Sequence, residues 1–215
     1  MRFISSLSHI ASILVCLIWP ILLQAQRITI GIEAGAPITR TFDTGFIYKG
    51  TFLPATDHYT VGPALDLHLV GSFHLFMNAL YQPYSFQQSY YLGTPADSKT
   101  TGSLWQVPVL LRYRILRGPL HPFVSLGPSF QLAANITQRY QSLLDSAPSI
   151  THPSPSRRVV AGVAAGAGVE LSIRRLHLLP EIRYTRWGAE NYDFSQTSHV
   201  GTNLNQLQLL VGLAF

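Results

Sequence analysis

The sequence predicts an all-β fold: a transmembrane, antiparallel, up-and-down β-barrel of eight strands. Three observations predict it. The chain begins with the pattern of an export signal. It then divides into segments in which apolar and polar residues alternate, and these segments are joined by alternately short and long connections. This combination is typical of membrane barrels, because strands that span a bilayer need an apolar outer face and no free edge.

Residues 1–25 have the pattern of a cleaved signal peptide. A positive start at Arg2 is followed by an apolar stretch that ends at the small residue Ala25. This stretch is shorter than the roughly 20 residues that a membrane-spanning helix needs. The single cysteine, Cys16, lies within it. Residues 26–215, the expected barrel domain, therefore offer no disulfide, thiol nucleophile or thiolate metal ligand.

The composition favours a membrane setting. The 215 residues are 47% hydrophobic and 12% charged, whereas soluble domains carry roughly 25% charged residues. No stretch after the leader is long and apolar enough for a helical span. The formal net charge is +5, but the basic residues are scattered and form no nucleic-acid motif. Nucleic acid is therefore not an expected partner.

Alternation is clearest in the last segment, where Leu207 and the following odd positions are apolar and the even positions include Gln206 and Gln208. This segment ends on the aromatic Phe215, which resembles the signal by which the barrel-assembly machinery recognises its substrates. That machinery is therefore an expected partner. The eight expected strands are 27–35, 59–69, 73–84, 104–114, 122–133, 159–173, 178–187 and 205–215.

The connections indicate how the barrel sits in the membrane. The short turns are 70–72, 116–120 and 174–175, and the long connections are 36–58, 90–102, 134–158 and 188–203. Outer-membrane barrels have short periplasmic turns and long extracellular loops. We therefore expect a bacterial outer-membrane protein in contact with outer-membrane lipids, with both termini periplasmic and the long loops extracellular.

Aromatic residues mark the expected membrane interfaces, where rings that are part apolar and part hydrogen-bonding are favoured. Those toward the long connections are Tyr59, Tyr81, Tyr84, Trp105, Tyr184 and Trp187, and those toward the short turns are Phe73, Tyr113 and Phe215.

Residues 105–114 (WQVPVLLRYR) and 121–130 (HPFVSLGPSF) resemble two strands of the outer-membrane β-barrel domain family, which includes PorT-like proteins and is similar to the small OmpA-like and OmpX-like barrels. Residues 165–170 and 181–184 also resemble later strands of that family. The resemblance implies a membrane barrel over most of the mature chain. Because PorT is linked to a secretion system, it also implies a secretion-associated role as one alternative.

A recurring set of charged residues shares the inward parity of the expected strands. The set is Glu33, Asp66, Arg112, Arg114, Glu170, Glu181 and Arg183. Eight strands leave an interior just wide enough for side chains, and a buried charge must be paired. We therefore predict an Arg–carboxylate network that plugs the lumen. A narrow transporter or ligand-binding barrel is the alternative.

The sequence does not favour an enzyme or a metal protein. Lipid A deacylases place a His and a nearby Ser on the penultimate strand; the matching residues 183–190 contain neither, and Ser195 and His199 fall in an expected loop. Inward histidines also gather next to the short turns, without ligand spacing along one strand. They are His68, His74, His121 and His177. We interpret them as rim residues and expect no cofactor.

The leading functional hypothesis is a structural or surface-interaction role. Loops on a rigid scaffold carry function, and connections 36–58 and 134–158 are the longest candidates. The sequence does not identify the external partner. A lipid A-modifying enzyme is the least favoured alternative.

Overall fold

The structure is a computed structural model that describes residues 28–47, 50–54, 59–91, 95–115, 120–142, 149–173, 176–191 and 198–215. The predicted signal peptide, residues 1–25, lies outside these ranges, so it stays a prediction. Within the described ranges no helix is long and apolar enough to cross a membrane.

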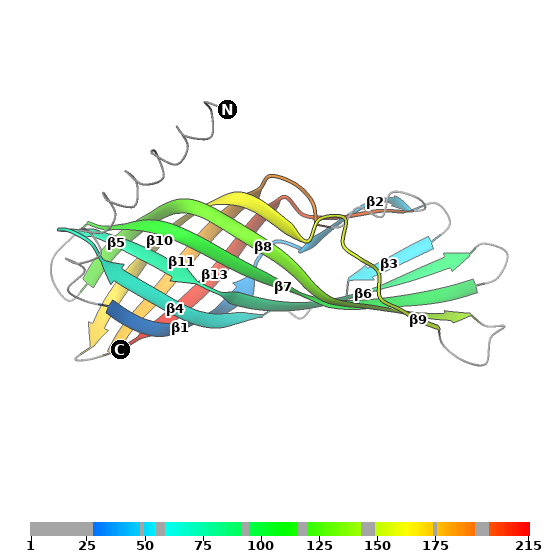
Figure 1. Cartoon of the computed structure of the whole chain (residues 1–215), viewed down its shortest axis with the longest axis horizontal. Helices are drawn as coiled ribbons and strands as arrows, with labels where there is room; N and C mark the ends of the chain where they lie inside the picture. Colours follow the sequence, from blue (N-terminus) through cyan, green and yellow to red (C-terminus); the bar gives the residue numbers. More distant parts are fainter. Residues whose placement is uncertain are drawn as a thin grey trace, which may run out of the picture.

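The described strands form a closed antiparallel barrel (Figure 1), as the sequence predicts. Its wall contains β1 (Ile28–Pro37), β4 (Thr60–His68), β5 (Phe73–Asn78), β6 (Leu80–Tyr91), β7 (Pro95–Arg114), β8 (Leu120–Ser142), β10 (Val159–Ile173), β11 (Leu176–Trp187) and β13 (Asn205–Ala214). Strands β5 and β6 continue one another in the same register along β7, so the wall has eight strands. The break between them lies opposite Pro108, which has no N–H to donate.

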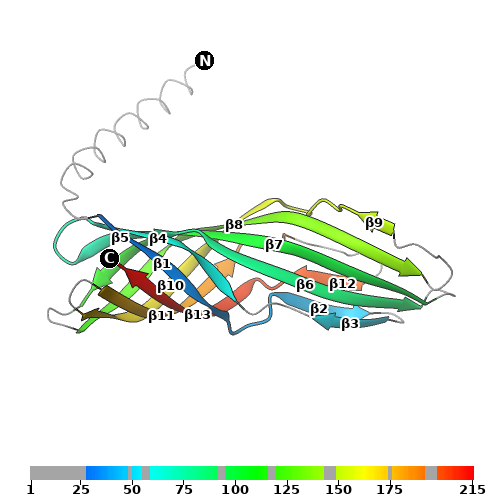
Figure 2. The ribbon, with the colours of Figure 1, turned by 90° about the horizontal axis from the view of Figure 1, so that it is seen from below.

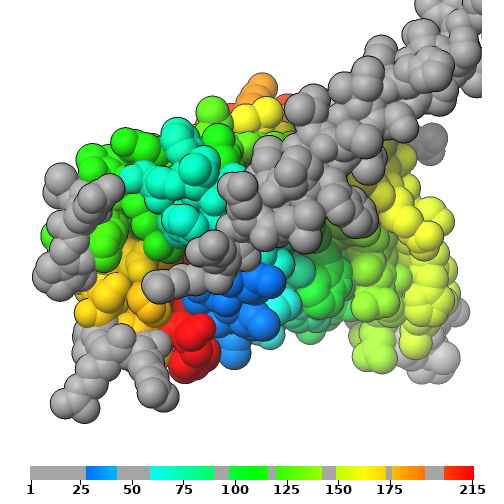
Figure 3. Space-filling view, turned by 60° about the vertical axis from the view of Figure 1, so that its left-hand side comes forward, coloured from blue at the N-terminus to red at the C-terminus, as the bar shows by residue number. Residues whose placement is uncertain are grey.

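The barrel closes between its first and last strands. Strand β1 pairs with β13 from Gly31 opposite Ala214 to Pro37 opposite Gln208, and β13 pairs with β11 on its other side. Figure 3 shows the end of β13 beside the blue start of β1 at the short-turn end. Closure leaves the wall without a free edge, as a membrane barrel requires.

Side-chain burial follows the predicted parity. In β13 Gln206, Gln208 and Leu210 are buried, whereas Leu209 and Val211 are exposed on the outer face. The lumen is therefore lined by polar residues together with some buried apolar ones such as Leu210, and the outside of the wall is apolar, as a bilayer requires.

The expected long connections contain more strand than the sequence predicts. Residues 90, 91 and 95–102, predicted to lie in a loop, belong to strands, because β6 runs to Tyr91 and β7 starts at Pro95, and the two pair along this length. β8 likewise continues to Ser142. Beyond the wall, Ser, Thr and Gln occupy both faces of these strands. The apolar alternation therefore ends although backbone pairing continues, which is why the sequence pattern places the strand ends too early.

Short strands in the other connections lie beside these extensions (Figure 2). They are β2 (Phe42–Ile47), β3 (Gly50–Pro54), β9 (Ser149–Thr151) and β12 (Ser198–Thr202). β3 pairs with β6, β9 pairs with β8, and β2 pairs with β12 as a separate two-stranded sheet. The described part of the long-loop end thus contains much paired backbone.

Two predicted interfacial aromatics are instead inside the barrel. Tyr84 and Trp187 are each 2% exposed. Trp187 follows Tyr184 by three positions, so parity turns it inward while Tyr184 faces out. The prediction for these two residues was wrong because it weighed residue type above parity. Tyr59, Trp105 and Tyr184 are exposed as expected, and Phe73 packs against Tyr113 with ring centroids 5.0 Å apart at the other end.

Candidate functional site

The seven charged residues chosen from the sequence meet inside the barrel, at its short-turn half. Five wall strands supply them: β1 gives Glu33, β4 gives Asp66, β7 gives Arg112 and Arg114, β10 gives Glu170, and β11 gives Glu181 and Arg183. The Arg114 side chain is 24% exposed, and the other six are almost completely buried. Strand parity is what turns all seven toward the same space.

Arg183 holds the inner half of the network. Its Nη2 lies 3.1 Å from Glu33 Oε1, and its Nε lies 2.8 Å from Glu181 Oε1. Asn78 also donates a hydrogen bond to Glu33. The other oxygen of Glu181 accepts from Arg112 Nη2 at 2.8 Å. Both carboxylates therefore have a guanidinium partner within the lumen.

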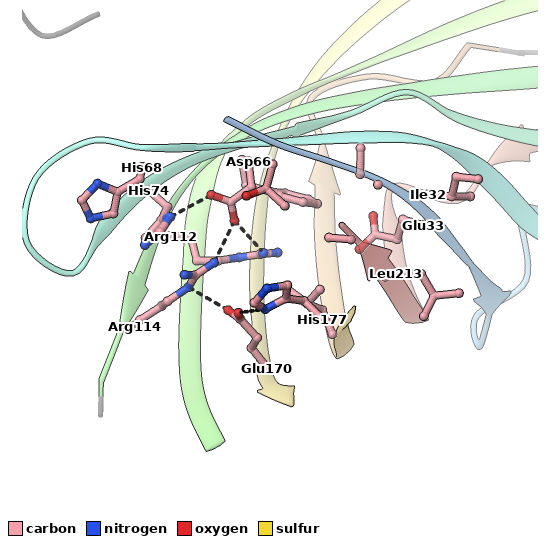
Figure 4. A pocket seen from close by; sticks show the side chains of 17 residues that line it. Ile32, Glu33, Asp66, His68, His74, Arg112, Arg114, Glu170, His177 and Leu213 are labelled. Atoms are coloured by element: carbon pink, nitrogen blue, oxygen red, sulfur yellow. Dashed lines mark hydrogen bonds and ion pairs between the residues drawn. The ribbon is translucent and has the colours of Figure 1, made fainter. Parts of the chain in front are cut away.

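The outer half lies nearer the short turns (Figure 4). Asp66 is 3.5 Å from Arg112 and 3.2 Å from Arg114, and His74 Nδ1 is 2.7 Å from its other oxygen. Arg114 Nε then lies 2.9 Å from Glu170 Oε2, and His177 Nδ1 lies 2.7 Å from Glu170 Oε1. Asp66 and Glu170 thus each join an arginine to a histidine.

The pairs form one unbroken chain in which carboxylates and guanidinium groups alternate. Its order is Glu33, Arg183, Glu181, Arg112, Asp66, Arg114 and Glu170. Each arginine lies between two carboxylates, so the attraction between opposite charges offsets the large cost of removing them from water. Four carboxylates against three arginines leave a formal charge of −1 when His74 and His177 are neutral.

Neighbouring residues fix the arginines in place. The Arg112 guanidinium lies over two aromatic rings, 3.9 Å from the centroid of Phe76 and 4.0 Å from that of Phe123. Such stacking is favourable and strengthens away from water. Gly166 leaves room for Glu181 and Ser125, because a Cβ at position 166 would clash with the Glu181 carboxylate and lie 2.6 Å from Ser125 Oγ. The glycine-rich run of β10 thus makes space for side chains from neighbouring strands.

A second, uncharged layer lies inside the barrel toward the long-loop end. Gln106 Nε2 donates to Gln82 Oε1 at 3.2 Å and to Gln206 Oε1 at 3.0 Å. Beyond these amides, buried apolar side chains pack together: Phe42, Tyr84, Phe86, Leu104, Ala133 and Ile136. Sequence reasoning missed this apolar cluster. Leu104 and Ala133 have inward parity, but Phe42 comes from β2, inside a predicted loop.

A cavity of about 360 Å³ opens beside the charged network at the short-turn end. Its walls include Asp66, His74, Arg114, Glu170 and His177. Three of the four predicted rim histidines line it, since His68 is also there. Among the described residues, however, no group of three or more His, Cys, Asp or Glu side chains is arranged to hold a metal ion.

One trio at this cavity contains the side chains of a hydrolytic triad. Ser172 Oγ lies 3.1 Å from His177 Nδ1, and the same nitrogen lies 2.7 Å from Glu170 Oε1. In a working triad the serine and the carboxylate contact different ring nitrogens, so that the imidazole can take the serine proton. Here they share one nitrogen. Ser195, considered from the sequence, lies outside the described residues.

These features define an outer-membrane β-barrel protein. Residues 24–193 match the family described as "Outer membrane protein beta-barrel domain", and the chain belongs to that family. Membership implies location in the outer membrane. A comparison with curated proteins gives no match.

Solved structures of small barrels resemble this fold. The outer membrane protein OprG from Pseudomonas aeruginosa aligns with a TM-score of 0.51 and 12% identity, covering 87% of this chain and 94% of its own. Neisserial surface protein A aligns with a TM-score of 0.45 and 14% identity, covering 87% of this chain and 95% of its own. The OprG likeness supports the fold alone.

Proposed function

We propose that this chain is a closed, non-catalytic outer-membrane barrel that holds a rigid polar surface outside the membrane for interaction with other molecules. The observation that carries the proposal is the unbroken chain of seven charges across the lumen. A solute path would have to separate these buried ion pairs, and breaking a buried pair costs roughly 3–5 kcal/mol.

The interior also favours a scaffold over a transporter. Beyond the ion pairs, hydrogen-bonded glutamines and a cluster of buried apolar side chains lie inside the barrel. A transporter would instead line a continuous path with polar groups. The geometry of His177 likewise favours a non-catalytic role, because Ser172 and Glu170 contact the same ring nitrogen instead of opposite ones.

The proposed orientation puts the short turns in the periplasm and the extended strands β6, β7 and β8 outside the cell. It rests on the length asymmetry of the connections, which is typical of outer-membrane barrels. The partners expected in this arrangement are outer-membrane lipids around the apolar wall and the assembly machinery that inserts the barrel. The external partner would meet the extended strands.

Cysteine labelling of intact cells tests the orientation. In a Cys16→Ser background, Gln141→Cys places a thiol on the exposed end of β8, and Val70→Cys places one in the exposed turn before β5. A membrane-impermeant maleimide is expected to label Gln141→Cys on intact cells and Val70→Cys only after lysis. The reverse labelling pattern would overturn the proposed orientation.

A further inference from the structure

The outer face of β6, β7 and β8 changes character beyond the aromatic level. Tyr81 and Trp105 lie side by side, with ring centroids 5.2 Å apart, where the apolar wall ends. Further along the same face come Ser, Thr, Gln and charged residues. Two adjacent rows cross the three strands: Gln87, Lys99 and Arg139, then Ser89, Asp97 and Gln141. The extended strands therefore present a polar sheet surface.

Lys99 and Arg139 stand directly opposite one another on neighbouring strands. Like charges in that position are destabilising unless something compensates them. Within the described part of the chain, neither side chain has an ion pair with a carboxylate; the nearby Asp97 belongs to the next row. Among the described residues, two neighbouring cations thus face outward with no carboxylate partner.

A shallow cavity of about 300 Å³ lies on this surface. It is lined by Gln87, Ser89, Asp97, Ser98, Lys99, Arg139 and Gln141. Amide and hydroxyl groups can donate to and accept from sugar hydroxyls, a carboxylate can accept from them, and the two cations complement an acidic substituent. The combination fits a ligand that is both polyhydroxylated and negatively charged.

We propose that this surface, defined by Lys99, Arg139 and the five residues around them, binds an acidic glycan. The proposal deepens the surface-interaction part of the proposed function and rests on it.

The height of Lys99 above the membrane argues against lipid phosphates as the ligand. Lys99 lies six residues from Trp105 along β7, or about 20 Å along the strand and about 15 Å in height after tilt. The headgroup layer on one side is only about 5–8 Å thick.

Binding of dextran sulfate oligosaccharide to the purified full chain in detergent micelles tests the proposal, with uncharged dextran of the same length as the control ligand. We expect dextran sulfate to bind and uncharged dextran not to compete with it. The affinity for dextran sulfate should fall as salt screens the charges. Lys99→Gln/Arg139→Gln should weaken binding about tenfold or more, because it removes two charge-assisted contacts.

Arg157→Gln/Arg158→Gln is the matched control, since it removes two exposed charges elsewhere at the same end. It should change the affinity less than about twofold. Equal weakening by both double variants, or none by the first, overturns the proposal. So does binding to phosphatidylglycerol vesicles that depends on Lys99 and Arg139 without any binding of dextran sulfate. Circular dichroism melting confirms that each variant is folded.

These outcomes are separate from failure of the proposed function. Glycan binding in micelles depends on neither lumen closure nor orientation in the cell. Absence of dextran sulfate binding therefore does not contradict the closed, non-catalytic barrel. Reversed cysteine labelling would contradict the proposed orientation even if dextran sulfate binds.

Discussion

The Nη2 of Arg183 lies 3.1 Å from Oε1 of Glu33, although the two residues are 150 positions apart in the sequence. Strand β13 lies between their strands in the wall, so the pair crosses the interior of the barrel near the point of closure. The contact therefore links barrel closure to the ion-pair network.

Replacing Arg183 is expected to destabilise the barrel strongly. Arg183→Gln leaves the buried Glu33 with Asn78 as its remaining partner, and breaking a buried pair in this way costs about 3–5 kcal/mol. Urea unfolding in detergent measures the change. The exposed Arg186→Gln is the control and should unfold near the wild-type midpoint. Arg183→Gln/Glu33→Gln should be more stable than Arg183→Gln alone; equal stability of wild type and Arg183→Gln would contradict the network.

Adding one methyl group at Gly166 should disturb the network from the wall. A Cβ there would lie 2.6 Å from Ser125 Oγ and would press on the Glu181 carboxylate. Overpacking of this kind costs about 1–3 kcal/mol. Gly212→Ala is the matched control, because its nearest neighbour would be Leu179 Cβ at 3.3 Å. Equal unfolding midpoints for the two variants would show that Gly166 does not make room for Glu181.

Quenching by brominated lipids distinguishes the two tryptophans of the wall. Trp105 is 38% exposed on the outer face, whereas Trp187 is buried in the lumen. In protein that lacks residues 1–25, Trp105→Phe should remove most of the lipid quenching, and Trp187→Phe should preserve it. Strong quenching of the tryptophan that remains in Trp105→Phe would place Trp187 against lipid and contradict the inward assignment.

The wall and the charged residues were predictable because both follow from period-2 alternation. Once β11 is aligned by its apolar outer face, Glu181 and Arg183 must point inward, and the narrow lumen requires partners for them. The sequence did not determine which partners meet. That depends on the stagger between strands, which puts Glu33 opposite Gly212 and brings Arg183 within reach.

The long-loop end was predicted less well for a physical reason. Outside the bilayer no apolar face is required, so β7 shows no alternation of apolar and polar residues between Asp97 and Thr101 although it pairs on both sides. The row of Lys99 and Arg139 lies in this part of the chain. Its pairing follows from the register of the extended strands, together with the irregularity between Thr101 and Ser103.

Single-channel recording in planar bilayers tests the central claim, that the ion pairs close the lumen. Purified protein in bilayers bathed in potassium chloride is expected to insert without stable conductance steps, while a general porin in the same apparatus shows them. Large, stable open channels from the wild-type barrel would contradict the account, because the proposal requires the Glu33–Arg183–Glu181–Arg112 chain to block the passage of ions.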